Sequence, residues 1–235
     1  MNTKPLLYGI KRSGIIEQIE LVEEYPSTIA SMLLEDQIDI GLVPVAIIPK
    51  LKEAHIVTDV CIGAVGEVAS VCLFSEVPIE QVETVLLDYQ SRTSVALFKV
   101  LIKEYWKKEV VFKEAKSGYQ QEIKGTTAGV VIGDRALVHR VSSPFTYDLA
   151  TAWQQHTGLP FVFAAWVANK KLSDDFIEEF SKANLLGLQH LEEVIIEQGE
   201  YPIYDLDTYY RKNISYQLTD EKRAGLDLFL KKLQA

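Results

Sequence analysis

A strand passes directly into a helix in the stretch Val85-Leu86-Leu87-Asp88-Tyr89-Gln90-Ser91-Arg92-Thr93-Ser94. The apolar residues before Asp88 predict a buried strand, and those from residue 95 to 107 recur at the spacing of one helix face. Ser91, Thr93 and Ser94 can each cap that helix. A strand, a polar turn and a helix in this order are typical of an α/β fold.

Segments on both sides repeat this alternation. Strands are predicted at 19–24, 39–45, 56–65, 68–75, 110–112, 128–134 and 161–167. Helices are predicted to open at Pro26 and to cover 135–139, 149–156, 174–184, 186–197 and 219–233. The continuous apolar character of 39–45 suits a parallel strand covered on both faces.

Two of these strands, Val68–Ser75 and Phe161–Val167, bracket a self-contained α/β unit. We therefore expect two lobes joined by a double crossover. Residues 70–165 form one lobe, and residues 1–69 together with 166–235 form the other. Folds of this kind hold their ligand in a cleft between the lobes.

Composition excludes several classes of function. The 235 residues carry 24 Lys and Arg against 33 Asp and Glu, a net charge of −9 that disfavours binding to nucleic acid or anionic membranes. No apolar run approaches the ~20 residues of a membrane-spanning helix, and no signal peptide is recognisable. Two isolated cysteines and four scattered histidines predict no metal site. We expect a cytoplasmic protein.

Three short motifs are candidates for ligand binding. The helix start at 91–94 favours an anion, since its backbone N–H groups carry partial positive charge, although simple capping beside a solvated Arg92 is the alternative. Gly133 ends a strand where backbone can approach a ligand, or it forms a turn in which Asp134 caps the next helix. Ser70 either points into a cleft or satisfies a backbone group.

Longer segments of the sequence resemble the chorismate dehydratase family of the futalosine route to menaquinone. The resemblance covers nearly the whole chain and rests on six pieces in order, namely 38–45, 69–75, 87–94, 132–137, 147–149, and Trp153 with 157–166, which include SRTS, IGD and TGLPFVFAAW. It implies a two-lobe type II periplasmic-binding-protein-like fold with a double crossover and an interlobe cleft.

The resemblance also implies a reaction, in which chorismate loses water to give 3-[(1-carboxyvinyl)oxy]benzoate, with no cofactor and no metal. Chorismate is then the small-molecule partner, and the enzyme is a monomer or a homodimer. Two alternatives remain: the sister enzyme that acts on cyclic dehypoxanthinylfutalosine, and a non-catalytic small-anion binder of the same fold. The sister enzyme's glycine- and threonine-rich turn differs from 91–94 here, so it ranks second.

Roles for individual residues follow from the same resemblance. Two residues are expected to be catalytic by hydrogen bonding near the leaving hydroxyl, Asn2 and Ser70. Six are expected to bind substrate: Ser91, Arg92, Thr93, Ser94, Gly133 and Asp134. None is an evident general base, so a carboxylate of the substrate itself is expected to take the proton.

The N-terminus departs from the family pattern. Family members usually begin with a short strand that ends in Ser-Tyr-Leu-Asn, and Asn2 falls on the asparagine of that motif. The chain starts at Met1, so the strand itself is expected to be missing. Either the start codon is assigned too late or the chain is a truncated form, and loss of a central strand exposes the ladders of its neighbours.

Overall fold

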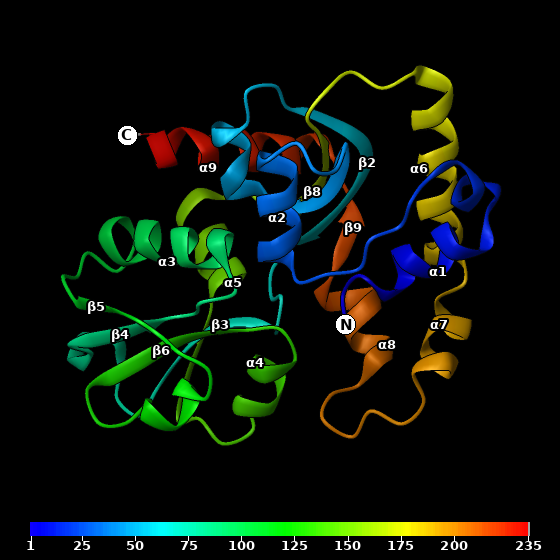
Figure 1. The fold of residues 1–235 in the computed structure, drawn as a ribbon. Helices are drawn as coiled ribbons and strands as arrows, with labels where there is room; N and C mark the ends of the chain where they lie inside the picture. Colours follow the sequence, from blue (N-terminus) through cyan, green and yellow to red (C-terminus); the bar gives the residue numbers. More distant parts are fainter. Residues whose placement is uncertain (235) are drawn as a thin grey trace. The chain divides into compact units, whose positions relative to one another are not determined.

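The computed structural model describes residues 1–234, which divide into two compact units (Figure 1). The first contains residues 1–63 and 162–219, and the second contains residues 64–161 and the C-terminal helix α9 (Asp220–Gln234). The predicted double crossover occurs at 63/64 and 161/162, and the chain crosses a third time at 219/220.

This third crossing changes the expected boundary, because residues 166–235 do not all join the first unit. Helix α9 packs into the second unit through Phe229, whose ring lies 5.9 Å from Trp153 and 4.9 Å from Phe161. A Cβ on Gly225 would lie 2.3 Å from the carbonyl oxygen of Pro160, so only glycine permits this close approach. Tertiary packing that joins distant segments leaves no local signal in the sequence.

The first unit is a four-stranded sheet with helices around it. The strands are β1 (Ile40–Pro44), β2 (His55–Ala64), β8 (Phe161–Ala168) and β9 (Ser215–Gln217), in the order β1-β8-β2-β9. The helices are α1 (Lys4–Arg12), α2 (Pro26–Leu34), α6 (Asp174–Gln189), α7 (Leu191–Gln198) and the short α8 (Leu206–Thr208). Shorter helical turns cover Gly14–Gln18, Val45–Lys50 and Tyr209–Asn213.

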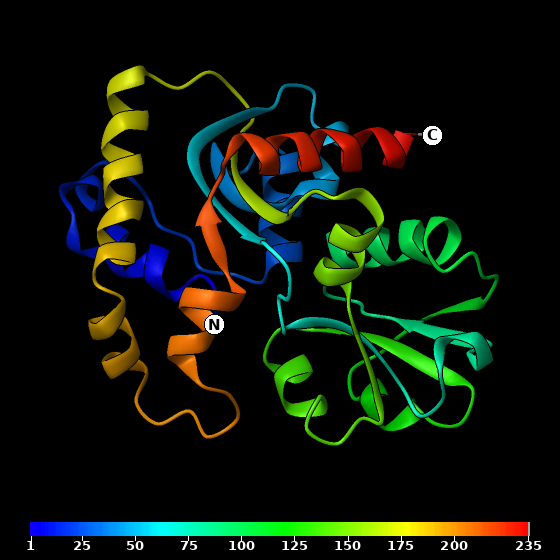
Figure 2. The same ribbon diagram turned by 180° about the vertical axis from the view of Figure 1, so that it is seen from behind.

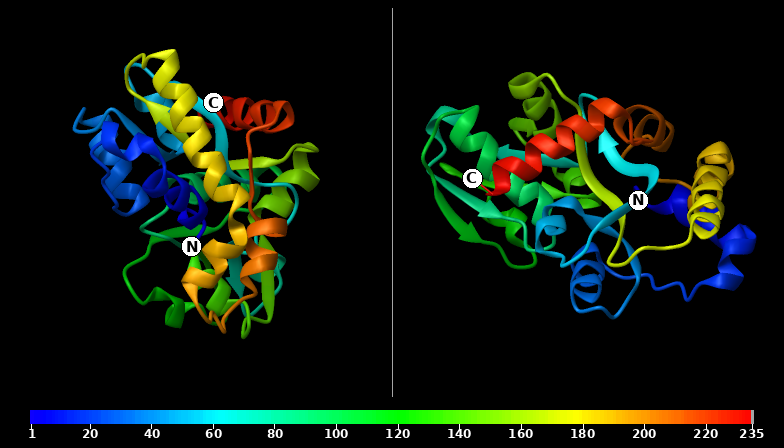
Figure 3. Two further views of the ribbon diagram at one scale, coloured as in Figure 1. Left: turned by 90° about the vertical axis from the view of Figure 1, so that its right-hand side faces the viewer. Right: turned by 90° about the horizontal axis from the view of Figure 1, so that it is seen from above.

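Helix α1, which the sequence analysis did not predict, lies against α6 (Figure 3). The two backbones meet at Gly9 and Gly187, where an added Cβ would lie 2.0 Å and 1.6 Å from backbone oxygens of the facing helix. Beneath this crossing, the indole of Trp166 stacks edge-on against Phe180 and donates a hydrogen bond to Asn184 Oδ1 at 2.9 Å. The buried polar groups are therefore paired.

The second unit is a five-stranded mixed sheet. Its strands are β3 (Val71–Ser75), β4 (Thr84–Leu87), β5 (Val111–Glu114), β6 (Thr127–Ile132) and β7 (Phe145–Asp148), in the order β5-β4-β6-β3-β7. Strand β4 pairs in parallel with β5 and β6, whereas β3 pairs antiparallel with β6 and β7. Turns of 3-10 helix cover Ile79–Gln81 and Tyr119–Glu122.

Helices cover both faces of this second sheet. Helices α3 (Arg92–Glu104) and α5 (Leu149–Thr157) lie on one face, and α4 (Asp134–His139) lies on the other (Figure 2). The predicted strand–turn–helix at 85–107 is thereby confirmed as β4 and α3. No helix within residues 1–234 is long and apolar enough to span a bilayer.

The strand predicted at 39–45 forms β1 but pairs antiparallel with β8, not in parallel as expected, and another predicted strand is wrong. Residues 19–24 are extended but pair with no strand in the described part of the chain. The apolar pattern of this segment is that of a strand, and its geometry is nearly so. The segment lacks a neighbouring strand to hydrogen-bond with, and a local sequence pattern cannot predict whether such a neighbour is present.

Candidate functional site

Seven of the eight predicted site residues lie at one edge of the second unit's sheet. The parallel strands β4 and β6 end at this edge, so the turn at 88–94 and the turn at 133–134 both follow carboxyl ends of strands. Ser70 precedes β3, whose first residue, Val71, pairs with Ile132 at the end of β6. Backbone joins two of these motifs, because Gly133 N–H donates to Ser70 C=O at 2.8 Å. Asn2 lies in the first unit.

The start of α3 is capped by Ser91. Its Oγ accepts a hydrogen bond from the backbone N–H of Ser94 at 3.1 Å, which selects one of the three predicted caps. Thr93 and Ser94 are buried beneath the first turn, and Arg92 is half-exposed. The hydroxyl proton of Ser91 remains able to donate, because capping uses only its oxygen as an acceptor.

A carboxylate beneath this turn holds the site together. Asp88 has no exposed side-chain surface; its Oδ1 accepts from Gln90 N–H at 2.8 Å and its Oδ2 accepts from Tyr119 Oη at 2.7 Å. Arg135 Nη2 donates to the same Oδ2 at 2.9 Å and to Gln90 Oε1 at 2.7 Å. This guanidinium therefore fastens the first turn of α4 to the turn before α3.

The loop before Ser70 is held in an unusual backbone conformation. Ala69 has a φ of +61°, a left-handed value that costs a residue with a Cβ about 1 kcal/mol. Asp148 secures it by accepting hydrogen bonds from the N–H groups of Val68 and Ala69, at 3.1 and 2.8 Å. Arg140 Nη1 donates to the Ala69 carbonyl at 2.9 Å. Strain held by such contacts is a common feature of functional sites.

Gly133 provides the second unusual conformation, with φ +63° and ψ −148°, a region that only glycine occupies readily. An added Cβ would meet nothing within 4 Å, so the backbone here borders open space. Gly133 itself is the cap residue of α4 and Asp134 is its first helical residue. The expectation that Asp134 is the N-cap was therefore wrong by one position.

Comparison with known proteins identifies the family. A family model described as menaquinone biosynthesis matches residues 1–235. The chain belongs to this family. Its relatives include a chorismate dehydratase from Thermus thermophilus, 27% identical over 256 aligned residues that cover 99% of this chain and 92% of the relative. A chorismate dehydratase from Campylobacter jejuni is 29% identical over 109 residues, covering 45% of this chain and 49% of the relative.

Solved structures similar to this menaquinone-biosynthesis protein confirm the fold class. A protein from Archaeoglobus fulgidus has a TM-score of 0.67 at 13% identity, over 99% of this chain and 92% of that one. The alkanesulfonate-binding protein SsuA from Xanthomonas axonopodis, bound to MOPS, has a TM-score of 0.58 at 14% identity, over 98% and 86%. The fold is that of type II periplasmic binding proteins.

Burial raises the pKa of two groups near the candidate site, Asp148 and Cys72. Burial raises the pKa of Asp148, and hydrogen bonds from the N–H groups of Thr151, Val68 and Ala69 oppose that rise. Burial and the neighbouring Asp148 carboxylate raise the pKa of the Cys72 thiol well above its ordinary range, so Cys72 is an inert core group at neutral pH. Within residues 1–234, no three His, Cys, Asp or Glu side chains cluster to hold a metal.

Sequence reasoning missed the positioning groups, namely Asp88, Tyr119, Arg135, Arg140 and Asp148. Asp88 and Asp148 share one local signal, because each ends a strand and precedes a helix. The long-range partners of these carboxylates lie 31 to 80 residues away, so no spacing could have paired them. Arg135 also keeps one buried donor, Nη1, without a hydrogen-bond partner among the described residues.

Proposed function

We propose that this chain is a chorismate dehydratase, which converts chorismate to 3-[(1-carboxyvinyl)oxy]benzoate and water in the first step of futalosine-dependent menaquinone biosynthesis. The observation that carries the proposal is the sequence similarity to the Thermus thermophilus chorismate dehydratase, which extends over 99% of this chain. It is supported by the gathering of Ser70, the 91–94 turn and Gly133 at one sheet edge.

The reaction needs orientation more than chemical activation. The C–H bond at the ring carbon bearing the enolpyruvyl ether breaks, and its electron pair forms a ring double bond. The adjacent C–O bond breaks, so the hydroxyl leaves and is protonated to water. The product ring is aromatic, which makes the step favourable overall. A site that fixes the dianion and guides one proton is therefore sufficient.

The start of α3 is the proposed carboxylate site. The N-terminus of this 13-residue helix carries partial positive charge, and Ser91, Thr93 and Ser94 supply hydroxyl groups there. Arg92 adds positive charge beside the turn, whereas the charge of Arg135 is balanced by the Asp88 carboxylate. These local charges outweigh the net charge of −9 for a ligand bound at short range.

Ser70 and Asn2 are proposed to hydrogen-bond the substrate near the leaving hydroxyl. For Ser70 the support is structural, because its loop is strained at Ala69 and fixed by Asp148 and Arg140. For Asn2 the support is the family resemblance alone. Gly133 and Asp134 complete the proposed set. The enolpyruvyl carboxylate of the substrate is proposed to accept the proton, since none of these side chains is an evident base.

Kinetics of two serine variants test the proposal. Ser70→Ala is expected to lower kcat/KM for chorismate by at least about tenfold, because one hydrogen bond made in the transition state is lost. Ser142→Ala is the matched control, since Ser142 is exposed and donates only to the His139 carbonyl. Equal rates in both variants and the parent chain, with unchanged thermal unfolding, would refute the role of Ser70.

Two alternative functions remain for experiment. A small-anion binder is favoured by the SsuA structure, a binding protein of the same fold. It predicts that chorismate binds without being consumed. The sister enzyme predicts turnover of cyclic dehypoxanthinylfutalosine and none of chorismate. We further propose a cytoplasmic location. We also propose a monomer or homodimer, and sedimentation of the purified chain measures this oligomeric state.

A further inference from the structure

Four strands form the edges of the two sheets, and one of them is exposed along its whole length. The four are β1 and β9 in the first unit and β5 and β7 in the second. Every residue of β5 is exposed, whereas β1, β7 and β9 each contain residues that are not. In β5, Val111 is 58% exposed and Phe112 is 42% exposed. An exposed, partly apolar edge strand can pair with a strand of another molecule.

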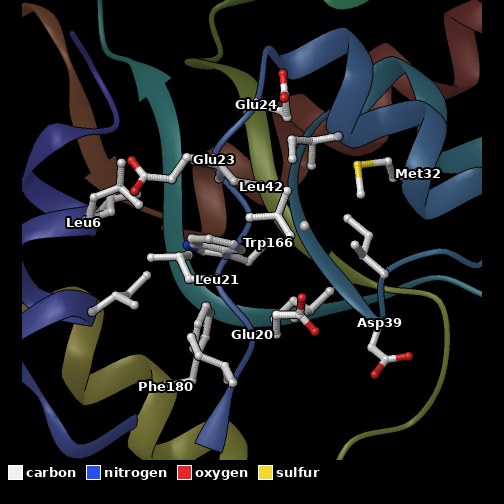
Figure 4. A pocket seen from close by; sticks show the side chains of 18 of the residues that line it. Leu6, Glu20, Leu21, Glu23, Glu24, Met32, Asp39, Leu42, Trp166 and Phe180 are labelled. Atoms are coloured by element: carbon white, nitrogen blue, oxygen red, sulfur yellow. The ribbon is translucent and has the colours of Figure 1, made fainter. Parts of the chain in front are cut away.

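The edge of β1 does not suit association with a second copy of the chain. Beside it lies a cavity of about 1050 Å³, with Leu21, Leu42 and Trp166 at its centre (Figure 4). Lys4 is the one cationic side chain of its lining, which also carries four carboxylates, those of Glu20, Glu23, Glu24 and Asp39. Two copies that met at this edge would bring like charges together.

The backbone groups of β5 point alternately toward β4 and away from it. Val111 N–H donates to the Glu83 carbonyl at 2.8 Å, and Ala115 N–H donates to the Leu87 carbonyl at 3.0 Å. The even-numbered residues between and beside them, such as Phe112, therefore direct their N–H and C=O groups outward. Strand β5 pairs only with β4. Two copies can form an antiparallel ladder here if even-numbered residues lie opposite even-numbered residues.

Charge selects one register for such a two-fold pair. When Val111 lies opposite Val111 of the second copy, Phe112 lies opposite Val110, and Lys113 lies opposite Glu109. Each of these last two pairs occurs twice. Lys113 and Glu109 then occupy a position without ladder hydrogen bonds, where opposite side chains approach most closely. The neighbouring registers, centred on Val110, Phe112 or Lys113, place a lysine opposite another lysine or opposite a valine.

The charged residues of this register are available, and the segment that carries them is fixed. Neither Glu109 nor Lys113 forms an ion pair or side-chain hydrogen bond within residues 1–234. Lys108 anchors the start of the segment, because its N–H donates to the Ile102 carbonyl at 2.9 Å and its Nζ donates to the Glu80 carbonyl at 2.7 Å. Little ordering would therefore accompany the pairing of this edge.

We propose that β5 is the surface through which two copies of this chain associate, by antiparallel pairing of their β5 strands about Val111. The two five-stranded sheets then form one sheet of ten strands, whose outer strands are the two copies of β7. The contact is self-complementary, so association ends at the dimer. Because two short strands bury a small area, we expect a dissociation constant of about 10–100 µM. This interface does not depend on the proposed reaction.

Two charge reversals test the proposal. Glu109→Lys and Lys113→Glu each place like charges opposite each other twice, so either variant is expected to dimerise at least about tenfold more weakly than the parent chain. An equimolar mixture of the two variants has opposite charges in both pairs and should dimerise as the parent does. Glu122→Lys, at an exposed position of the same unit, is the control and should leave association unchanged. Sedimentation equilibrium from about 1 µM to about 1 mM measures all five samples.

Hydrogen exchange gives a second readout at the backbone. The Phe112 amide is expected to exchange at least about threefold more slowly at about 1 mM parent chain than at about 1 µM. The Val111 amide, which already donates to Glu83, should show no such change.

Three results would overturn the proposal, provided that thermal unfolding of the variants matches that of the parent. The first is a parent chain that stays monomeric at about 1 mM. The second is a dimer that both reversals leave unchanged. The third is a mixture of Glu109→Lys and Lys113→Glu that associates no better than either variant alone. None of these measurements depends on chorismate turnover.

Discussion

The Asp88 carboxylate shows how a single buried charge organises the candidate site. It has no exposed surface and is compensated by Arg135, Tyr119 and the Gln90 N–H. Removing one partner of a buried ion pair costs more than the pair contributes, because the remaining charge stays desolvated. Asp88 and Arg135 therefore act together, and the turns before α3 and α4 depend on both.

A double-mutant cycle tests this coupling. Arg135→Met is expected to lower the free energy of unfolding by about 3–5 kcal/mol, since it leaves Asp88 buried without its cation. Adding Asp88→Asn to that variant should restore part of the loss, because the uncompensated charge is gone. Urea denaturation of the parent, both single variants and the double variant gives the coupling. Strictly additive losses would show that the pair does not act as a unit.

At the scale of elements, α1 and α6 depend on a contact between two glycines. Gly9 and Gly187 allow the helix backbones to approach so closely that a Cβ on Gly187 would lie 1.6 Å from the Pro5 carbonyl oxygen. The helices must therefore separate if either glycine is replaced.

Replacing one glycine tests the crossing. Gly187→Ala is expected to lower the free energy of unfolding by about 3 kcal/mol, at the upper end for overpacking, because backbone rather than a flexible side chain must move. Gln189→Ala, at an exposed position of the same helix, is the control and should change stability by less than about 0.5 kcal/mol. Thermal unfolding measures both. A Gly187→Ala variant as stable as the control would show that the two helices do not pack at this distance.

At the scale of the whole molecule, sequence patterns predicted the α/β class, two units and the first two crossings. They also predicted the strand–turn–helix at 85–107, and seven of the residues that they proposed for the site lie at one sheet edge. They did not predict the third crossing, the unpaired state of 19–24 or the carboxylates that position the site. Those depend on contacts between distant segments, as when Phe229 packs on Trp153 or Asp148 accepts from Val68. Such contacts leave no periodicity.

Attachment of α9 to the second unit is expected to depend on pH. Lys232 donates a hydrogen bond to Glu104 of α3, and this bond lowers the pKa of Glu104, with His156 contributing at 3.3 Å. A lowered carboxyl pKa contributes stability above its unfolded value, and that stability is lost as the pH falls through the lowered pKa. Lys232→Ala should thus cost about 1 kcal/mol at pH 7 and progressively less below pH 4. Urea denaturation across this range checks it, and a loss independent of pH would contradict it.

Conversion of chorismate by the purified protein tests the central claim most directly. Chorismate is incubated with the parent chain and, separately, with Ser70→Ala, and each mixture is followed by ultraviolet absorbance and mass spectrometry. The account predicts one aromatic product, lighter than chorismate by one water, for each chorismate consumed, with formation strongly slowed in Ser70→Ala. Chorismate that binds to the parent chain yet is recovered unchanged would contradict the account and identify a binding protein.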